Sequence, residues 1–287
     1  MSKLAITTLT IGETYSQIWN EYFREDWETY AQRHGYDLVV FDTPLCEDPH
    51  NRPPHWQKLL ICTHPSLAGY DRVAWVDSDI GIQPEKAPCL FENVPPEKVG
   101  IALHGELQDP LYKEIAMERW ISTFSKLHGK DFSSFWDDYF KRADLPLPGE
   151  PRYNTGVLAL SPRHHGKLLE SVFEKYTKGA FDHEQTFLNY ELIQAGLVHE
   201  IDPRFNREAG AEILKHYPFL FLLDDERTAI GAFEAFDKLA GACLKTIWER
   251  SWFLHFSGAT WLQALWSIHV REDKNTDWRK TLGEILG

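Results

Sequence analysis

The opening third of the chain alternates between short apolar runs and one long amphipathic segment, and this order constrains the fold more than any other feature. Residues 4–9 form an apolar, strand-like run, and aromatic residues recur at helical spacing through residues 15–34. Gly35 is a suitable helix stop. Residues 37–41 and 72–76 are again apolar and strand-like. This strand–helix–strand order predicts a right-handed crossover connection and a parallel sheet.

The same alternation continues to the end of the chain. We expect further strands at 99–103, 157–160 and 253–256, and further helices at 56–67, 111–127, 132–142, 163–177 and 183–195. The pattern predicts an α/β fold, with a mostly parallel, Rossmann-like central sheet flanked by helices. We expect one domain over residues 1–287, with a helical insertion at 110–150 and a C-terminal helical cap at 260–287.

Composition excludes several classes of protein. A formal net charge of −13 argues against a nucleic-acid partner, because phosphate backbones are bound by an excess of Lys and Arg. The N-terminus lacks the apolar core of a secretory signal, and no apolar run approaches the roughly 20 residues of a membrane span. The four cysteines are scattered without a CxxC pair. We therefore expect a cytoplasmic protein with reduced thiols and no transmembrane segment.

The chemistry centres on two carboxylates that follow an apolar strand. Asp77 and Asp79 come directly after the strand-like residues 72–76. Ligands bind at the carboxyl ends of strands in open α/β sheets, and two aspartates spaced by one residue can grip one divalent cation. Hard oxygen ligands favour Mg²⁺ or Mn²⁺. On the motif alone, a solvent-facing turn is an equally good interpretation, since Asp is common in turns.

Four further motifs occur in a fixed order before and after this aspartate pair. A lysine-bearing segment, Trp56-Gln57-Lys58-Leu59, precedes its strand, and Asn154-Thr155-Gly156, Glu184-Gln185 and His255-Phe256-Ser257-Gly258 follow it. Over residues 4–260 the chain resembles retaining glycosyltransferases of the GT-A type. Within that type, the motifs resemble those of the glycogenin-like and lipopolysaccharide-galactosyltransferase-like group. They also resemble those of the fungal-type galactosyl- and mannosyltransferases.

The resemblance implies a metal-dependent hexosyltransferase with a nucleotide-sugar donor, most simply a UDP-sugar. Asp77 and Asp79 would hold Mn²⁺ or Mg²⁺, and His255 would be the third protein ligand. His255 between two apolar neighbours also fits a core histidine.

The resemblance also assigns residues to the donor. Thr8 and Tyr15 match positions that meet the nucleoside, although Tyr15 fits the apolar face of the first helix equally well. Lys58 matches a basic residue near the donor, and a solvated helical lysine is the alternative. The other matching positions are Asn154, Gly156 and Gly258. An asparagine offers both a donor and an acceptor to sugar hydroxyls, and a glycine permits close backbone approach.

The pair Glu184-Gln185 matches an Asp-Gln pair that in this group lies beside the anomeric carbon. The resemblance implies transfer with retention of configuration. A neutral amide cannot be a strong nucleophile, which fits a front-face route in which the leaving phosphate helps to deprotonate the acceptor. The chain departs from the group at Thr186, where a second acid is usual, and after Gly258, where a Lys-Pro-Trp sequence is common. The phosphate-binding lysine expected after Gly258 is therefore missing, and Lys58, Lys245 or Arg250 are candidates to replace it.

Two other functions fit the motifs. A phosphatase of the haloacid-dehalogenase type also places Asp-x-Asp at a strand end, with Asp224 and Asp225 as a later acid pair. A non-catalytic nucleotide-sugar binder would keep the site without turnover. The acceptor, whether a saccharide, a lipid-linked molecule or a protein, stays open. Aromatic residues in the insertion would either shape an acceptor cleft or pack it: Trp120, Phe132, Phe135, Trp136 and Tyr139.

Overall fold

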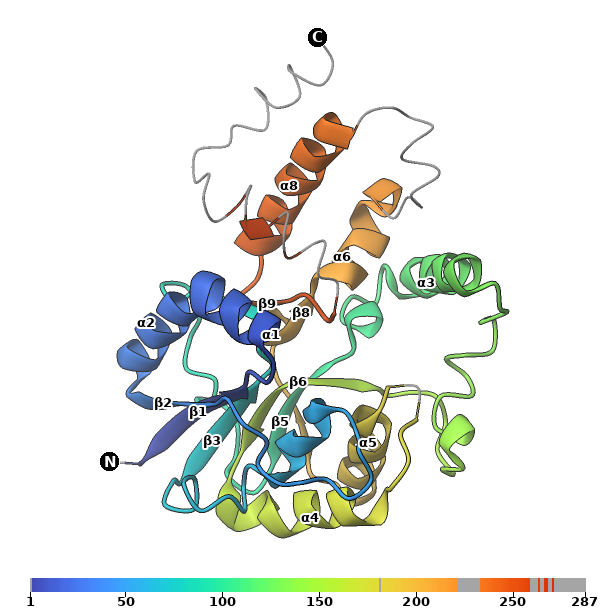
Figure 1. The fold of residues 1–287 in the computed structure, drawn as a ribbon. Coiled ribbons are helices and arrows are strands. Elements are labelled where there is room, and N and C mark those ends of the chain that lie inside the picture. Colours follow the sequence, from blue (N-terminus) through green and yellow to red (C-terminus); the bar gives the residue numbers. More distant parts are fainter. Residues whose placement is uncertain are drawn as a thin grey trace.

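A six-stranded sheet forms the centre of the protein in a computed structural model. The structure describes residues 2–180, 182–220 and 233–258, with single positions at 263, 266, 267 and 270. The strand order is β2 (Tyr36–Phe41), β1 (Leu4–Leu9), β3 (Arg72–Val76), β6 (Tyr153–Leu160), β5 (Val99–Leu103) and β7 (Val198–Glu200). All pairings are parallel except those of β6, which runs opposite to both of its neighbours. The predicted α/β fold with a mostly parallel sheet is confirmed (Figure 1).

Successive side chains of the central strands belong alternately to two hydrophobic cores, one on each face of the sheet. Ile6, Ala74 and Val76 belong to one core, whereas Val73 and Trp75 belong to the other. This alternation follows from the two-residue period of a strand. Because both faces are covered, the central strands β1, β3 and β6 are buried along nearly their whole length and are mostly apolar, as expected for buried strands.

The first core is covered by the N-terminal helical segment. Helix α1 (Glu13–Ile18) passes through a π-helical turn, Trp19–Phe23, into α2 (Arg24–His34). Gly35 ends α2 in the left-handed conformation, as the sequence predicts. A later helix, α8 (Phe233–Glu249), contributes to the same core.

The second core is covered by α4 (Pro162–Lys175) and α5 (Glu184–Gln194), which Figure 1 shows on the opposite face of the sheet. Helix α3 (Lys113–His128) packs against α6 (Ala209–His216). The aromatic residues of the predicted insertion are buried in this second core, so they pack the fold: Trp120, Phe132, Phe135, Trp136 and Tyr139.

Two predicted helices are wrong. Residues 56–67 form only a 3₁₀ helix, η2 (Pro54–Leu60), followed by turns, and Pro65 disfavours helical backbone at the residue before it. Residues 132–142 form turns that end in a 3₁₀ turn, Lys141–Ala143. There the carboxylate of Asp131 accepts from the backbone N–H of Ser133, which competes with helix formation.

A small second sheet was not predicted: its strand at 253–256 was expected and is present as β9, but the other two strands are too short to show a pattern. It pairs β4 (Ile80–Ile82) with β9 (Phe253–His255), and β9 with β8 (Arg207–Glu208). Strand β7 and helices α6 and α8 were also missed, and β6 begins at Tyr153, earlier than expected. The expected C-terminal cap at 260–287 lies largely outside the described residues.

Two further observations bear on the sequence-based expectations. All four cysteines are unpaired: Cys46, Cys62, Cys89 and Cys243. None of the helices among the described residues combines the length and the apolarity that crossing a bilayer requires.

Candidate active site

The Asp77–Asp79 segment lies at the carboxyl end of β3, between the two sheets. Asp77 follows the last residue of β3, and its backbone N–H donates to the carbonyl of Gly156 in β6. Asp79 precedes β4, whose first residue, Ile80, pairs with His255 of β9. The small sheet therefore brings a histidine from near the end of the described chain to the aspartate pair.

Three side chains here meet the requirements of a divalent cation. Ligand atoms of Asp77, Asp79 and His255 all lie within 4.8 Å of one another. His255 Nε2 is 3.4 Å from Asp79 Oδ1 and 4.0 Å from Asp77 Oδ2. Two carboxylates and one imidazole are a ligand set suited to Mn²⁺, and they also accept Mg²⁺. The residues present thus fit the metal that the sequence motif suggests.

Neighbouring groups orient the carboxylates. The backbone N–H of Gly258 donates to Asp79 Oδ2 at 3.0 Å. The indole Nε1 of Trp75 donates to Asp77 Oδ1 at 2.6 Å. Metal ligands in proteins are commonly held by such outer hydrogen bonds, so the aspartates are preorganised rather than free to rotate.

Asn206 fixes the tautomer of His255. The amide Nδ2 of Asn206 donates to the backbone oxygen of Asn154 at 3.2 Å and to its Oδ1 at 2.8 Å. The amide oxygen of Asn206 therefore faces His255 Nδ1, 2.9 Å away, and accepts from it. With a proton on Nδ1, the lone pair of a neutral His255 is on Nε2, the atom that faces the aspartates.

His255 and Asp79 shift the pKa values of one another toward their charged forms. Burial lowers the pKa of His255, but Asp79 more than offsets this, and the net pKa is raised. Burial raises the pKa of Asp79, but His255 holds the net value below its ordinary range. A cation at this position competes with the proton on Nε2, so binding should release a proton.

Gly156 makes room for His255. A Cβ atom built on Gly156 would lie 2.4 Å from Cε1 and 2.7 Å from Nδ1 of His255. The residue is fully within β6 rather than in a turn before it. Glycine is therefore required here by the imidazole that packs against the strand. Asn154, two residues earlier in β6, supports the same histidine through Asn206.

We expect Gly156→Ala to weaken Mn²⁺ binding while the protein stays folded. The added methyl group must displace the His255 ring, and losing the support of a metal ligand commonly costs 10–100-fold in metal affinity. Titration calorimetry with MnCl₂ measures this change. Gly100→Ala is the matched control. That glycine lies in the adjacent strand β5, and its added Cβ would also be crowded, at 2.9–3.0 Å from side-chain atoms of Ala159, Val94 and Ile201, but not against His255. Equal Mn²⁺ affinity of Gly156→Ala and wild type would contradict the predicted role of His255.

Lys58 is enclosed between two carboxylates. Its side chain is 2% exposed, and Nζ lies 3.0 Å from Asp77 Oδ1 and 3.0 Å from Glu184 Oε1. Burial lowers the pKa of the ammonium, but Asp77 and Glu184 hold the net value above its ordinary range. Lys58 thus stays charged and ties the end of β3 to the start of α5.

Gln185 is also engaged with the sheet. Its Oε1 accepts from the backbone N–H of Thr155 at 2.9 Å, and its Nε2 lies 3.4 Å from Asp182 Oδ2. Burial raises the pKa of Asp182. The amide and this carboxyl group line the same cavity next to Thr155 and Glu184.

Two cavities adjoin at the aspartate pair. The polar pocket, about 420 Å³, is lined by His55, Lys58, Asp77, Asp79, His104, Asn154, Thr155, Gly156, Asp182, His183, Glu184, Gln185, His255, Ser257 and Gly258. The apolar pocket, about 410 Å³, is lined by Leu9, Ile11, Tyr15, Pro53, Pro54, His55, Trp75, Asp77, Ser78, Asp79 and Gly258. The phenol of Tyr15 is 56% exposed, so a flat ligand can reach it. Of the residues that the resemblance assigns to the metal, the donor and the reaction, all except Thr8 line one of these pockets.

Thr8 lies in the interior of β1. It is fully buried, and its hydroxyl has no hydrogen-bond partner among the described residues. The proposed substitutes for the missing phosphate-binding lysine, Lys245 and Arg250, line neither pocket. Asp224 and Asp225, the acid pair of the phosphatase hypothesis, lie outside the described residues.

Sequence reasoning missed several residues of this region. Asn206 gives no motif signal, because it reaches His255 only through the fold. His104 belongs to a buried group with Glu106 and Glu208. Burial lowers the pKa of His104, but the two glutamates raise it to about 9, so the ring that faces the polar pocket is cationic at neutral pH.

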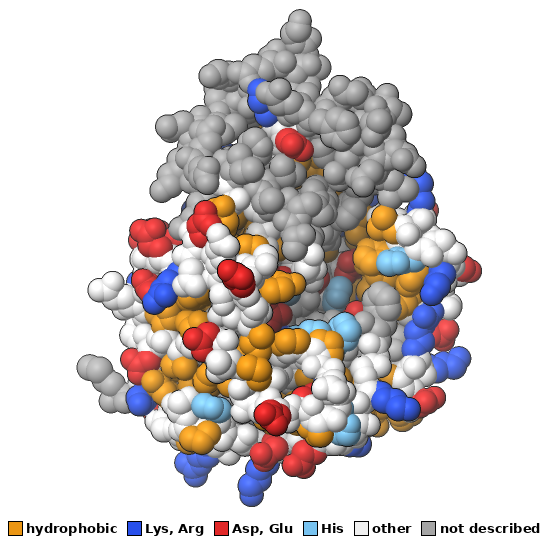
Figure 2. Space-filling model, viewed as in Figure 1, with side chains coloured by type: hydrophobic (Ala, Val, Ile, Leu, Met, Phe, Trp, Pro, Cys, Tyr) orange, Lys and Arg blue, Asp and Glu red, His pale blue; other side chains and the backbone are white. Residues whose placement is uncertain are grey.

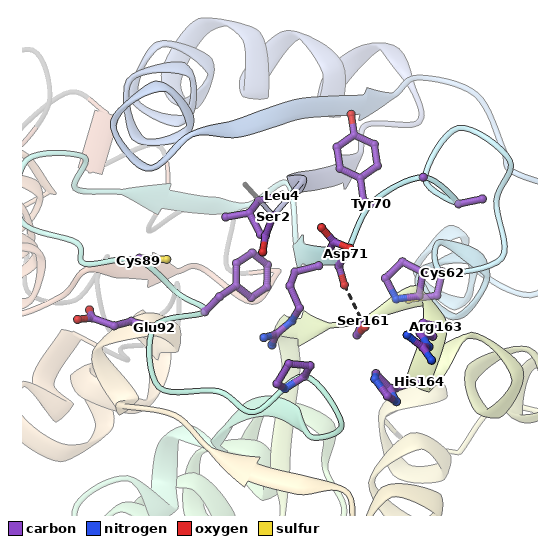
Figure 3. Close-up of a pocket in the computed structure, with 16 residues that line it drawn as sticks. Ser2, Leu4, Cys62, Tyr70, Asp71, Cys89, Glu92, Ser161, Arg163 and His164 are labelled. Atoms are coloured by element: carbon purple, nitrogen blue, oxygen red, sulfur yellow. Dashed lines mark hydrogen bonds between the residues drawn. The ribbon is translucent and has the colours of Figure 1, made fainter.

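A larger cavity, about 920 Å³, lies at the opposite edge of the sheet. Leu4 and Asp71 stand at the amino ends of β1 and β3, and Ser161 follows the end of β6 (Figure 3). The Ser161 hydroxyl donates to the backbone oxygen of Asp71. None of the sequence-predicted site residues lines this cavity, and ligands of open α/β sheets bind at the carboxyl edge. The candidate active site is therefore the pair of smaller pockets.

Comparison with known proteins supports the fold. No protein-family model matches the chain, and no curated protein matches it. One similar solved structure is a glycosyltransferase involved in the glycosylation of the major capsid of PBCV-1; the TM-score is 0.51 at 16% identity, covering 91% of this chain and 98% of that one. Another is the bifunctional glycosyltransferase WbbM, with a TM-score of 0.52 at 11% identity. This chain shares the fold of these two glycosyltransferases.

The match to WbbM covers 99% of this chain and 52% of that protein, so the chain spans about half its length. Identities this low establish the arrangement of strands and helices and leave the reaction to be argued from the site. The site and the fold agree in one respect: the aspartate pair lies where open α/β sheets bind their ligands.

Proposed function

We propose that the protein is a metal-dependent glycosyltransferase that transfers a hexose from a nucleotide sugar, most simply a UDP-sugar, to an acceptor hydroxyl. The proposal depends mainly on one observation: Asp77, Asp79 and His255 lie close enough together to bind one cation, and the two aspartates line both pockets. The similarity to glycosyltransferase structures supports the same class. The apolar pocket with Tyr15 suits a nucleoside, and the polar pocket suits a sugar.

The residues of the two pockets would have different roles. Asp77, Asp79 and His255 would hold Mn²⁺ or Mg²⁺, which when bound stabilises the negative charge of a departing diphosphate as a Lewis acid. Glu184, Gln185 and Asn154 offer oxygen and amide groups to sugar hydroxyls in the polar pocket. Lys58 holds Asp77 and Glu184 in place and balances their charge. Gly258 fixes Asp79.

A panel of nucleotide sugars and free nucleotides tests the proposal, with thermal shift measured in the presence and absence of Mn²⁺. A specific donor should raise the melting temperature by mass action only when the metal is present. Turnover then separates the functions. A transferase slowly hydrolyses its nucleotide sugar, a phosphatase cleaves simple phosphate monoesters, and a non-catalytic binder does neither. Cleavage of monoesters without any response to nucleotide sugars would contradict the proposal.

We expect transfer with retention of configuration, and we expect the side chain of Gln185 to contribute to turnover. An inverting enzyme needs a base within hydrogen-bond reach of the acceptor hydroxyl, whereas the family resemblance places the neutral Gln185 amide by the anomeric carbon. Gln185→Ala should reduce turnover about 10²-fold, near 2.7 kcal/mol of transition-state stabilisation. Proton NMR of the product gives the stereochemistry, and an inverted product would contradict the assignment.

The control for this variant must separate activity from stability. Removing the Gln185 side chain leaves the buried N–H of Thr155 without its acceptor, which costs about 1–3 kcal/mol of folding free energy. Turnover is therefore measured per mole of folded protein, below the melting temperature of the variant. Gln194→Ala, at the exposed end of the same helix, should leave both turnover and stability unchanged.

A further inference from the structure

The polar pocket extends beyond the edge that it shares with the apolar pocket. The shared residues are His55, Asp77, Asp79 and Gly258. In the proposed function, on which this inference rests, a nucleotide sugar occupies both pockets. Its diphosphate links the nucleoside to the sugar and would therefore lie at the shared edge, near the candidate metal site. The residues that line only the polar pocket are then placed to contact the hexose.

Several polar side chains of this part of the pocket are already engaged with other groups of the protein. The ammonium of Lys58 lies between Asp77 and Glu184. The amide oxygen of Gln185 accepts from the backbone N–H of Thr155. These contacts position the side chains, and they also use part of the hydrogen-bonding capacity that a sugar would need. Recognition of the sugar therefore requires further groups.

His104 reaches the polar pocket from the carboxyl end of β5. Its Nδ1 lies 2.5 Å from Glu106 Oε2 and 3.7 Å from Glu208 Oε1. Two carboxylates on this side of the ring hold a proton on Nδ1 and favour the charged imidazole. The opposite nitrogen, Nε2, forms no hydrogen bond with a described residue. Figure 2 shows histidine side chains gathered around the hollow in the middle of this face.

Asp182 lines the same pocket from the segment that precedes α5. Its Oδ2 lies 3.4 Å from Gln185 Nε2, which is a long contact, so the carboxyl group keeps acceptor capacity for a ligand. Burial raises the pKa of Asp182, and the charge of His104 opposes this rise, so the two side chains interact. The family resemblance places Gln185 by the anomeric carbon, and its neighbour Asp182 is therefore on the sugar side of the pocket.

These two side chains suit a sugar hydroxyl better than an acidic substituent. An imidazolium donates hydrogen bonds and a carboxylate accepts them, and a hydroxyl can do both. The carboxylate of a uronic acid would bond to His104 but would face the carboxyl group of Asp182. We propose that His104 and Asp182 bind hydroxyl groups of the donor hexose, with His104 as hydrogen-bond donor and Asp182 as acceptor, and that they select a neutral hexose.

Calorimetric titration of the Mn²⁺-saturated protein with UDP, UDP-glucose and UDP-galactose tests the role of Asp182. Asp182→Ala should weaken binding of the preferred UDP-hexose by about 10-fold or more, the loss expected for a hydrogen bond to a charged group. The affinity for UDP should not change, because UDP lacks the sugar. Asp182→Asn keeps an acceptor oxygen and should recover part of the loss. Asp42→Ala, at an exposed position after β2, is the matched control.

Deoxy analogues of the preferred UDP-hexose identify the hydroxyl that Asp182 binds. In the wild type, removing that hydroxyl should weaken binding by about 10-fold or more. In Asp182→Ala, the same removal should have little further effect, because the contact is already lost. If every deoxygenation has the same effect in Asp182→Ala as in the wild type, the role of Asp182 is overturned.

Two variants of His104 isolate its hydrogen bond from its charge. His104→Gln keeps an N–H donor near the position of Nε2, whereas His104→Leu does not, and both lose the charge that compensates Glu106. The Gln variant should bind the preferred UDP-hexose about 10-fold more tightly than the Leu variant. Equal affinities overturn the role of His104. If circular dichroism shows that either variant is unfolded, Glu106→Gln is added to both, which removes the uncompensated carboxylate and keeps the comparison.

The outcomes separate this inference from the proposed function. Wild-type protein that binds UDP and a UDP-hexose, with unchanged affinities in the Asp182 and His104 variants, overturns the inference and leaves the transferase proposal standing. Wild-type protein that binds none of these ligands in the presence of Mn²⁺ contradicts both. A variant that loses affinity for UDP and Mn²⁺ together with the hexose would show that the residue supports the fold, which also overturns its role in sugar recognition.

Discussion

Asp79→Asn should abolish measurable glycosyl transfer and weaken Mn²⁺ binding by more than about 10²-fold, since changes in residues that merely support ligands already cost 10–100-fold. Asp79 faces His255 Nε2 at 3.4 Å and is held by the backbone of Gly258, so its carboxylate is aimed at the candidate metal position. An asparagine preserves the size of the side chain and removes the charge. Titration calorimetry with MnCl₂ and a donor-hydrolysis assay measure the two effects.

The matched control is Asp42→Asn. Asp42 also follows a strand at the carboxyl edge of the sheet, but it is exposed and lines neither pocket. Its Mn²⁺ affinity should equal that of the wild type. Near wild-type turnover of Asp79→Asn at saturating donor would show that the metal assignment is wrong.

Asp77→Asn should lose the metal as well, but it should also lose more stability than Asp79→Asn. Asp77 is one of two carboxylates that compensate the buried Lys58. Without it, the ammonium keeps only Glu184, and an undercompensated buried charge is costly. The comparison between the two variants therefore separates the metal-binding role of the aspartates from their structural role.

Lys58→Met should destabilise the protein by about 3–5 kcal/mol, the range observed when one partner of a buried ion pair is removed. Lys58 is 2% exposed, so solvent screens its interactions little. The variant leaves Asp77 and Glu184 facing one another without a cation between them. Urea unfolding monitored by tryptophan fluorescence gives the change in the free energy of unfolding.

Two further variants isolate the cause of this loss. Lys58→Met combined with Glu184→Gln should be more stable than Lys58→Met alone, because one of the uncompensated charges is gone. Lys167→Met, at an exposed position of α4, should change stability by less than about 0.5 kcal/mol. A Lys58→Met variant as stable as the wild type would mean that the lysine is a solvated surface charge, as many helical lysines are.

The first predicted strands and the αβα layering could be derived from the sequence because they depend on local patterns. Residues 4–9 and 72–76 are mostly apolar runs, as is typical of buried parallel strands. The N-terminal helix and its stop at Gly35 follow from the 3.6-residue period and from the left-handed conformation that glycine adopts. The predictions of helices at 56–67 and 132–142 were wrong, because apolar spacing alone does not distinguish a helix from turns whose side chains are buried.

The sequence by itself determined that Asp77 and Asp79 end an apolar strand, and so that they lie at a ligand-binding edge. Only the tertiary structure decided what surrounds them. His255 reaches Asp79 through the pairing of β4 and β9, two strands of three residues each. Asn206 then fixes the tautomer of His255, and Gly156 leaves space for its ring. These contacts join residues far apart in the chain, and they exist because burying both faces of the sheet brings the segments together. Local sequence patterns do not predict contacts between residues that are far apart in the chain.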